Sequence, residues 1–202
     1  FDPLLPVAQA MLANALLSAG RLQEAETLLD AARERWPGHP SLWAITYRLL
    51  LYSGRPQAAA AFVLEPDFRP DDMSADDVAG FVRLARAVGG RQAADVEASV
   101  EHRIRLAGAD VHSITSSAPI FALLGRSDLT FSAWDRYFLN RGDFGVPTPI
   151  EPYTRRYARE LFSLPMAPLR SDPRFSRLLH EIGLETYWQR TRTVPDYRRT
   201  GG

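Results

Sequence analysis

Apolar side chains recur along the chain at helical spacing, in runs that glycine residues interrupt. Asp2-Pro3 can open a first helix, which Gly20 ends in a left-handed cap; its predicted apolar face is Leu5, Ala8, Leu12 and Leu16. The next run predicts a partner helix from about residue 22 to residue 36, with a buried stripe of Leu22, Ala25, Leu29 and Ala32. Because Pro37-Gly38 stops this run, the two helices are expected to form a hairpin around Gly20.

Glycine returns between helical runs at an almost constant interval. Gly54 follows Gly20 by 34 residues, Gly89 comes 35 residues later, and Gly125 another 36. The interval predicts further hairpins at residues 40–66, at 76–88 with 91–107, and at 112–124 with 128–139. The acidic segment 65–77 reads as a loop leading into a helix capped by Ser74 or Asp76. Paired helices at a repeat of this length are typical of solenoids, in which each hairpin stacks on the next.

Residues 6–39 resemble a tetratricopeptide repeat. The positions that match its pattern of large and small residues are Leu12, Ala13, Leu16, Gly20, Leu22, Ala25, Leu29, Ala32 and Pro37. Gln9 stands where the repeat has a large first residue. The resemblance weakens along the next three hairpins. It implies an all-α, right-handed superhelix of about four hairpins, followed by a short C-terminal helical cap.

The helical pattern of apolar residues ends at Arg141, where several prolines and glycines predict an irregular connector. We expect a helix at about 149–162, a short helix opened by Asp172-Pro173, a break at Gly183 before residues 184–190, and a frayed end at 193–202. The side chains expected to cover the last repeat are Phe175, Leu178, Ile182, Tyr187 and Trp188. The predicted organisation is therefore repeats in 1–140 and a connector with capping helices in 141–202, packed as one continuous unit.

The C-terminal part carries a second resemblance. The string from Met166 to Trp188, with the later Val194-Pro195-Asp196-Tyr197, is similar to the closing segment of bacterial tetratricopeptide regulators that carry a winged-helix or nucleotide cyclase domain. The resemblance implies the C-terminal module of a bacterial regulatory protein. A first residue Phe1 rather than Met also leads us to expect a piece of a longer protein.

Composition narrows the classes of function. The formal net charge is zero, so no overall field favours nucleic acid or a membrane surface. All 24 basic residues are arginine, and the absence of cysteine excludes disulfides and thiolate chemistry. No apolar run approaches the roughly 20 residues that span a bilayer. We therefore expect a cytoplasmic protein with no membrane and no direct nucleic-acid contact.

No set of residues has the spacing of a catalytic or metal site. Asp110, His112 and Ser113 come nearest, but such close neighbours in sequence do not normally form a triad. The four histidines form no zinc motif, and no phosphate loop or dinucleotide fingerprint occurs. The arginines at 155, 156, 159, 198 and 199 read as solvated helix surface. We expect no catalytic residue, no cofactor and no metal.

The candidate binding residues stand at fixed offsets before the repeat glycines. Asn14, Arg48 and Arg83 each lie six residues before their glycine, a position that faces the concave groove in tetratricopeptide repeats. Leu51, Tyr52 and Arg86 complete the predicted groove. Arginine binds carboxylates with a planar pair of donors, so the predicted partner is a protein or peptide that could be acidic. The alternative is that these arginines bond neighbouring helices or the acidic loop.

The sequence thus predicts a non-catalytic protein–protein interaction module that binds a partner segment in its concave face. A ligand-sensing domain of a transcriptional or signalling regulator is the alternative, and a closed apolar pocket would favour it. A hydrolase is the third hypothesis, and titratable groups gathered in one cleft would be its sign.

Overall fold

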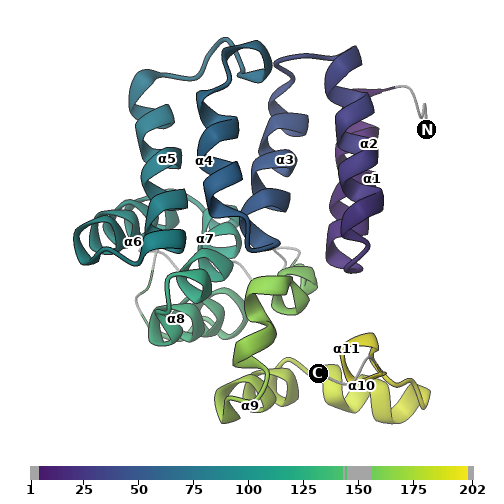
Figure 1. Ribbon diagram of the computed structural model, residues 1–202. Helices are drawn as coiled ribbons and strands as arrows, with labels where there is room; N and C mark the ends of the chain where they lie inside the picture. The colour runs from purple at the N-terminus through teal and green to yellow at the C-terminus, as the bar shows by residue number, and fades with distance from the viewer. Residues whose placement is uncertain (1–4, 143, 145–155, 200–202) are drawn as a thin grey trace. The chain divides into compact units, whose positions relative to one another are not determined.

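Every regular element of the described chain is helical. The structure is a computed structural model that describes residues 5–142, 144 and 156–199, and within these residues it has eleven α-helices, three 3-10 helices and no strand (Figure 1). The predicted all-α class is therefore confirmed. Contacts divide the chain into two compact units, residues 1–99 and 100–202.

The first unit is a row of helices in chain order. Its elements are α1 (Pro6–Ser18), α2 (Leu22–Arg35), α3 (Pro40–Tyr52), α4 (Pro56–Leu64), the 3-10 helix η1 (Pro66–Phe68) and α5 (Ala75–Gly90). The helix α6 (Ala93–Ala107) continues from this unit into the second. Helix α3 packs on both α1 and α2, while α4 packs on α3 and on α5. Consecutive helix pairs stacked side by side are the arrangement that the repeat interval predicts.

Two of the predicted glycine turns in this unit have the same backbone geometry. Gly20 and Gly54 adopt φ of +73° and +75°, a region where a side chain would be strained. At the first turn, the N–H of Arg21 donates to the carbonyl of Leu16 at 2.9 Å; at the second, the N–H of Arg55 donates to Leu50 at 2.9 Å. This bonding satisfies carbonyls at the helix end and reverses the chain. Gly125 in the second unit repeats it, with φ +74°.

Gly89 does not cap a helix, contrary to the sequence prediction. Helix α5 runs through Gly89 to Gly90, and Arg91 takes the left-handed position with φ 54°. Gly89 serves packing instead, because a Cβ placed on it would lie 2.9 Å from Cγ of Pro56 on α4. The equal spacing of the glycines therefore hides two different physical roles.

Aromatic rings fill the contact between α3, α4 and α5. Trp43 and Tyr47 of α3 both meet the ring of Phe81 edge to face, at centroid distances of 4.9 and 5.0 Å, and Trp43 also stacks on Phe62 of α4. The Tyr47 hydroxyl donates to the carbonyl of Phe81 at 2.8 Å. Such pairs add specific geometry to the apolar burial. Ser74 caps α5 as one of the predicted alternatives, since its Oγ accepts from the N–H of Asp77 at 3.1 Å.

The predicted buried face of α1 is partly wrong. The helix buries Ala8, Ala10, Ala13, Asn14 and Leu17, whereas Leu5 and Leu12 are 54% and 51% exposed. Helix α1 has apolar residues on every side, so periodicity alone cannot show which side faces the core. The proposed start at Asp2-Pro3 lies outside the described residues, and Pro6 occupies the first turn instead. The stripe predicted for α2 is confirmed at Ala25, Leu29 and Ala32, which are buried, whereas Leu22 is only partly buried.

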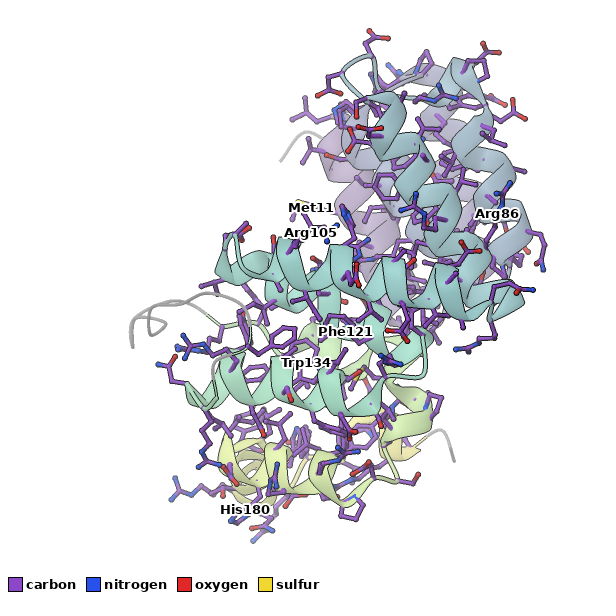
Figure 2. All side chains as sticks on the ribbon, turned by 90° about the vertical axis from the view of Figure 1, so that its left-hand side faces the viewer. Met11, Arg86, Arg105, Phe121, Trp134 and His180 are labelled. Carbon is purple, nitrogen blue, oxygen red and sulfur yellow. The ribbon has the colours of Figure 1, made fainter. Side chains whose placement is uncertain are left out.

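The second unit pairs one more hairpin with short C-terminal helices. Its further elements are α7 (Val111–Leu123), α8 (Ser127–Leu139), the 3-10 helices η2 (Arg159–Phe162) and η3 (Leu164–Leu169), α9 (Pro173–Glu181), α10 (Leu184–Thr191) and α11 (Asp196–Arg199). Helix α7 packs on α8, η2 and η3, and α8 packs on α9. Phe121 and Trp134, which Figure 2 labels, are both fully buried.

The predicted capping side chains mostly reach this core. Phe175 and Leu178 are buried, and Ile182 and Trp188 pack against the same cluster, but Tyr187 is 58% exposed. No α-helix covers 156–162, where a 3-10 turn follows three irregular residues; the rest of the helix predicted at 149–162 lies outside the described part. The end is not frayed throughout, since Tyr197 stacks on Phe162 at 5.2 Å. The domain boundary at 140 stays a prediction, beside a contact boundary at 99/100.

Candidate functional site

Three of the predicted groove residues form a contact between helices α1 and α3. Arg48 donates from its guanidinium to Oδ1 of Asn14, a residue 34 positions earlier, and its guanidinium carbon lies 5.6 Å from the ring centre of Tyr52. Asn14 and Tyr52 are buried, at 7% and 8% exposure. The alternative that such an arginine bonds a neighbouring helix therefore describes Arg48 in this structure. A role for these three residues in partner binding stays a prediction.

Leu51, another predicted groove residue, lies in the core of the first unit. It is 1% exposed. A fully buried leucine contributes to stability through the apolar area that it removes from water. Leu51 stands three residues before Gly54, on a side of α3 that faces the other helices.

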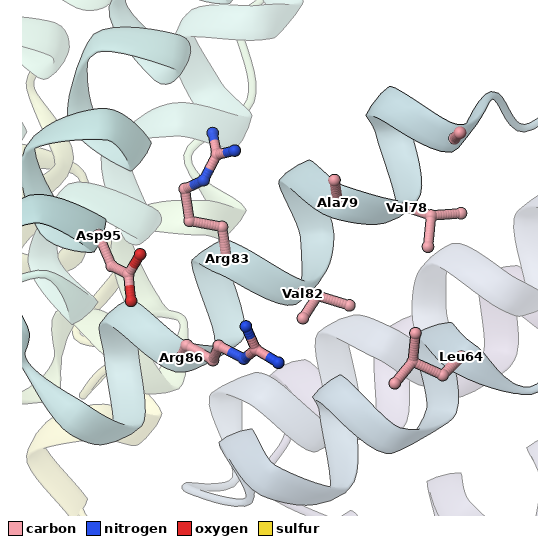
Figure 3. A pocket seen from close by; sticks show the side chains of 8 residues that line it. Leu64, Val78, Ala79, Val82, Arg83, Arg86 and Asp95 are labelled. Atoms are coloured by element: carbon pink, nitrogen blue, oxygen red, sulfur yellow. The ribbon is translucent and has the colours of Figure 1, made fainter.

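Arg83 and Arg86 are the predicted residues that reach the surface. Both are exposed and stand one turn apart on α5. They line a surface hollow of about 400 Å³ together with Leu64 of α4, with Val78 and Val82 of α5, and with Asp95 of α6 (Figure 3). No ion pair of either arginine is found within the described residues, although Asp95 shares the hollow. Two cationic groups thus border an apolar floor.

A second hollow continues the first along the same two helices. It measures about 410 Å³ and is lined by Pro56, Gln57 and Ala60 of α4 and by Ala85 and Gly89 of α5. Arg86 and Asp95 line both hollows, so the two join at these residues. We call the combined feature the α4–α5 groove. Helix α5 has 16 residues, which gives the groove a length of about 24 Å at 1.5 Å per residue.

The sequence predicts the arginines of this groove but not its walls. Leu64, Val78 and Val82 are not among the predicted residues, although Val78, Val82 and Arg86 recur at helical spacing along one side of α5. That spacing is the signal that could have located the groove. Leu64 carries no such signal. It is the last residue of the short helix α4, and its 56% exposure is a feature of the structure that the sequence pattern does not show.

The nearest approach to a catalytic set is a helix cap. The carboxylate of Asp110 accepts from the backbone N–H of Ser113 at 3.1 Å and from its hydroxyl at 2.5 Å. This bonding occupies both groups at the first turn of α7, as capping residues do. Among the described residues, no three His, Asp or Glu side chains gather as they would to hold a metal ion. No helix in the described chain is long and apolar enough to cross a bilayer.

The C-terminal arginines have partners within the second unit. Arg156 donates to the carbonyl of Tyr137 at 2.6 Å, and Arg159 pairs with Glu160 at 3.2 Å. Arg198 pairs with Glu185 at 3.1 Å and lies over the Tyr197 ring. Arg155 lies outside the described residues. Arg159, Arg198 and Arg199 are exposed, as expected of a solvated surface, whereas Arg156 is partly buried in an irregular segment, so the prediction of a solvated helix face is wrong for Arg156.

Comparison with known proteins identifies one repeat. Residues 6–49 match the family model of the tetratricopeptide repeat, which covers α1, α2 and most of α3. No curated protein and no solved structure matches the chain. The matched region contains the Gly20 turn and the Asn14–Arg48 contact, so the part of the chain with the clearest repeat sequence also has regular stacking. The protein therefore contains a tetratricopeptide repeat, which indicates a protein-interaction module.

Proposed function

We propose that the first unit is a non-catalytic interaction module that binds an acidic segment of a partner protein in the α4–α5 groove. The observation that carries the proposal is the pair of exposed guanidiniums, Arg83 and Arg86, beside the apolar floor of Leu64, Val78 and Val82. Guanidinium groups bind carboxylates through paired hydrogen bonds. An apolar floor with a few polar groups at its edge is the usual make-up of a peptide site.

The size of the groove suits a short segment. A length of about 24 Å accommodates roughly seven residues of extended chain at about 3.3 Å each, or about four turns of helix. The segment would place one or two bulky apolar side chains on Leu64 and Val82 and a carboxylate at Arg86, where the two hollows meet. Asp95 at the same point would disfavour further negative charge there, so we expect acidic residues toward Arg83.

A library of displayed peptides tests the proposal. Peptides are selected on the protein and then measured against an Arg83→Ala/Arg86→Ala double variant. We expect the selected peptides to combine acidic and bulky apolar residues, and the double variant to weaken their binding by roughly tenfold or more, as for loss of charge-assisted hydrogen bonds. The matched control is Arg105→Ala, which removes an exposed arginine that lies outside the groove.

Two results would contradict the proposal. One is a set of peptides without acidic residues, and the other is binding that the double variant leaves unchanged. Arg48→Ala, in a separate measurement, tests whether the Asn14–Arg48 contact also takes part. Because this variant is expected to be less stable, its binding is measured under conditions in which circular dichroism shows it folded, and a loss of binding there would extend the site to α3.

The wider setting is also a proposal. We place this module in a cytoplasmic regulatory protein of bacteria, and the support is the resemblance of Met166–Trp188 to the closing segment of such regulators. The sequence of the full gene product tests it. A winged-helix or cyclase domain ahead of the repeats would agree with the proposal, and a different kind of domain would overturn it.

A further inference from the structure

The walls of the α4–α5 groove are two antiparallel helices. A Cβ on Gly89, near the end of α5, would meet Pro56 at the start of α4, whereas Leu64 at the end of α4 lines the first hollow with Ala75 at the start of α5. Helices pack by laying side chains into the channels between rows of a neighbour's side chains. A channel between two helices is therefore shaped to take a third helix along it.

On α5 the groove follows one row of residues spaced four apart. The first three members of the row, Val78, Val82 and Arg86, line the first hollow (Figure 3), and the last, Gly90, lines the second. Rows at this spacing form the ridges on which helices pack. Gly90 and its neighbour Gly89 are exposed and carry no side chain, so the backbone of an occupant can approach α5 closely at this end.

An extended segment would lie poorly on these walls. The walls are helical, so their backbone N–H and C=O groups bond within each helix and leave no strand edge for a peptide to join. Of the residues that line the first hollow, only Asp95 has a side-chain acceptor for the N–H groups of a bound backbone. Burying unpaired N–H groups over Val78 and Val82 would cost free energy, whereas a helix bonds its own backbone. The groove therefore favours a helical occupant.

The two hollows are separated by a helical interval. Val82 lines the first hollow and Gly89 the second, seven positions along α5, which is about 10.5 Å at 1.5 Å per residue. A helix carries residues seven apart on one face at this distance. An extended chain covers the distance in about three residues, so the side chains at its two ends point to opposite faces. Arg86 stands between Val82 and Gly89 and lines both hollows, where an acid on the same face of a bound helix would reach it.

We propose that the occupant is an acidic amphipathic helix of a partner protein, with bulky apolar side chains seven positions apart, one in each hollow, and a carboxylate between them at Arg86. Charge complementarity argues for the acid, because Arg83 and Arg86 are exposed guanidiniums beside the apolar floor. The tetratricopeptide repeat argues for a protein as the source of the helix. This inference rests on the proposed function and adds the conformation and the spacing of the bound segment.

A designed peptide of about 15 residues is the probe. It is an alanine- and glutamine-rich helix with two leucines seven positions apart and glutamates midway between them, and fluorescence anisotropy follows its binding to the whole chain. We expect proline at a central, outward-facing position to weaken binding by roughly tenfold or more, because it breaks the helix. Moving one leucine by two positions turns it away from the groove and should have an effect of the same size. Helix-favouring α-aminoisobutyrate at outward positions should tighten binding by about two- to fivefold, because less freedom is lost on binding.

Two variants of the chain assign the leucines to the hollows. Gly90→Leu fills the second hollow, where a Cβ added to Gly90 lies 3.9 Å from Cγ of Gln92, and Leu64→Gln makes the first hollow more polar. Each should weaken the probe by roughly fivefold. A probe with one leucine replaced by alanine should lose its sensitivity to one variant and keep its sensitivity to the other. The matched control is Gly80→Leu, on the same helix and outside both hollows, and circular dichroism checks that each variant keeps its helices.

The results separate this inference from the proposed function. Library peptides that need Arg83 and Arg86 but tolerate proline, together with no binding of the designed helix, would overturn the helical occupant and leave the acidic segment standing. A designed helix that binds regardless of its leucine spacing, or equally well to Gly90→Leu and Leu64→Gln, would also overturn it. If neither kind of peptide responds to the Arg83→Ala/Arg86→Ala double variant, both proposals fail.

Discussion

Arg48 and Arg83 hold the same position relative to a repeat glycine, yet one joins two helices and the other faces solvent. Arg48 meets an acceptor, the side-chain carbonyl of Asn14, on the preceding helix α1. The residue of α3 that corresponds to Asn14 is Arg48 itself, 34 positions on, and an arginine offers only donors. An arginine on the following helix α5 therefore finds no acceptor at that position. In a stacked array, whether a polar side chain bonds a neighbouring helix or faces solvent depends on whether the preceding repeat offers a hydrogen-bond partner at that position.

The largest expected effect is a difference between Arg48→Ala and Arg83→Ala in the free energy of unfolding. Arg48→Ala leaves the buried carbonyl of Asn14 without its donor and removes the guanidinium from the Tyr52 ring, so we expect a loss of about 2 kcal/mol in the free energy of unfolding. Arg83→Ala should change it by no more than about 0.5 kcal/mol, as for exposed positions in general. Urea unfolding followed by tryptophan fluorescence measures both. Equal losses would end the contrast between them.

A second contrast concerns two glycines of one helix. Gly89→Ala brings a Cβ to 2.9 Å from the Pro56 ring, which cannot move away easily, so we expect a loss of about 1 kcal/mol. Gly80→Ala has no atom within 4 Å of the added Cβ and should stabilise α5 by about 0.5–1 kcal/mol through helix propensity. Thermal unfolding of the two variants gives the comparison. A gain in both would mean that α4 and α5 do not rely on the close approach at Gly89.

The sequence predicts hairpins well because their signals are local. A glycine with φ near +73° and the bonding around Gly20 depend on a few adjacent residues, so the turns at Gly20, Gly54 and Gly125 follow from the pattern. The face that a helix buries depends on its neighbours. Helix α1 is apolar on all sides, and nothing local shows that Leu12 is exposed while Ala13 is buried. Gly89 could not be distinguished from a cap, because its role lies in the distance to Pro56.

The candidate site was predictable to the same extent. Counting back from a glycine locates polar residues along a helix, and this found Arg83 and Arg86. The walls of the α4–α5 groove come from residues 56–64 and 75–95, two segments whose approach is a tertiary event. Leu51 has the offset from its glycine that predicts a groove residue, but its side of α3 is covered by other helices. Spacing thus selects candidates, and burial decides among them.

The smallest expected effect concerns how stability depends on pH, for an arginine bonded to acids compared with an arginine bonded to an amide. Arg174 of α9 is the counterpart of Arg48 in the second unit: it pairs with Asp172 at 2.7 Å and with Asp128 of α8 at 2.6 Å, over the Phe131 ring. The hydrogen bonds from the Arg174 side chain, and then from its backbone N–H, lower the pKa of Asp172 below its ordinary value. Asp172 is also the cap of α9, accepting from the Arg174 N–H at 2.9 Å.

A pH series on Asp172→Asn isolates the charge, because asparagine is an equally good cap. A carboxyl whose pKa is lower in the folded state stabilises the fold above its unfolded pKa of about 3.9, and this contribution disappears as the pH falls through the folded pKa. We expect wild type to exceed the variant by about 0.5 kcal/mol near neutral pH, with the difference constant down to about pH 5, smaller near the unfolded pKa and absent once the pH lies below the lowered folded pKa. The stability difference for Arg48→Ala should not change over the same range, because the amide of Asn14 does not titrate. A difference for Asp172→Asn that persists in acid would assign its effect to the cap rather than to the ion pair.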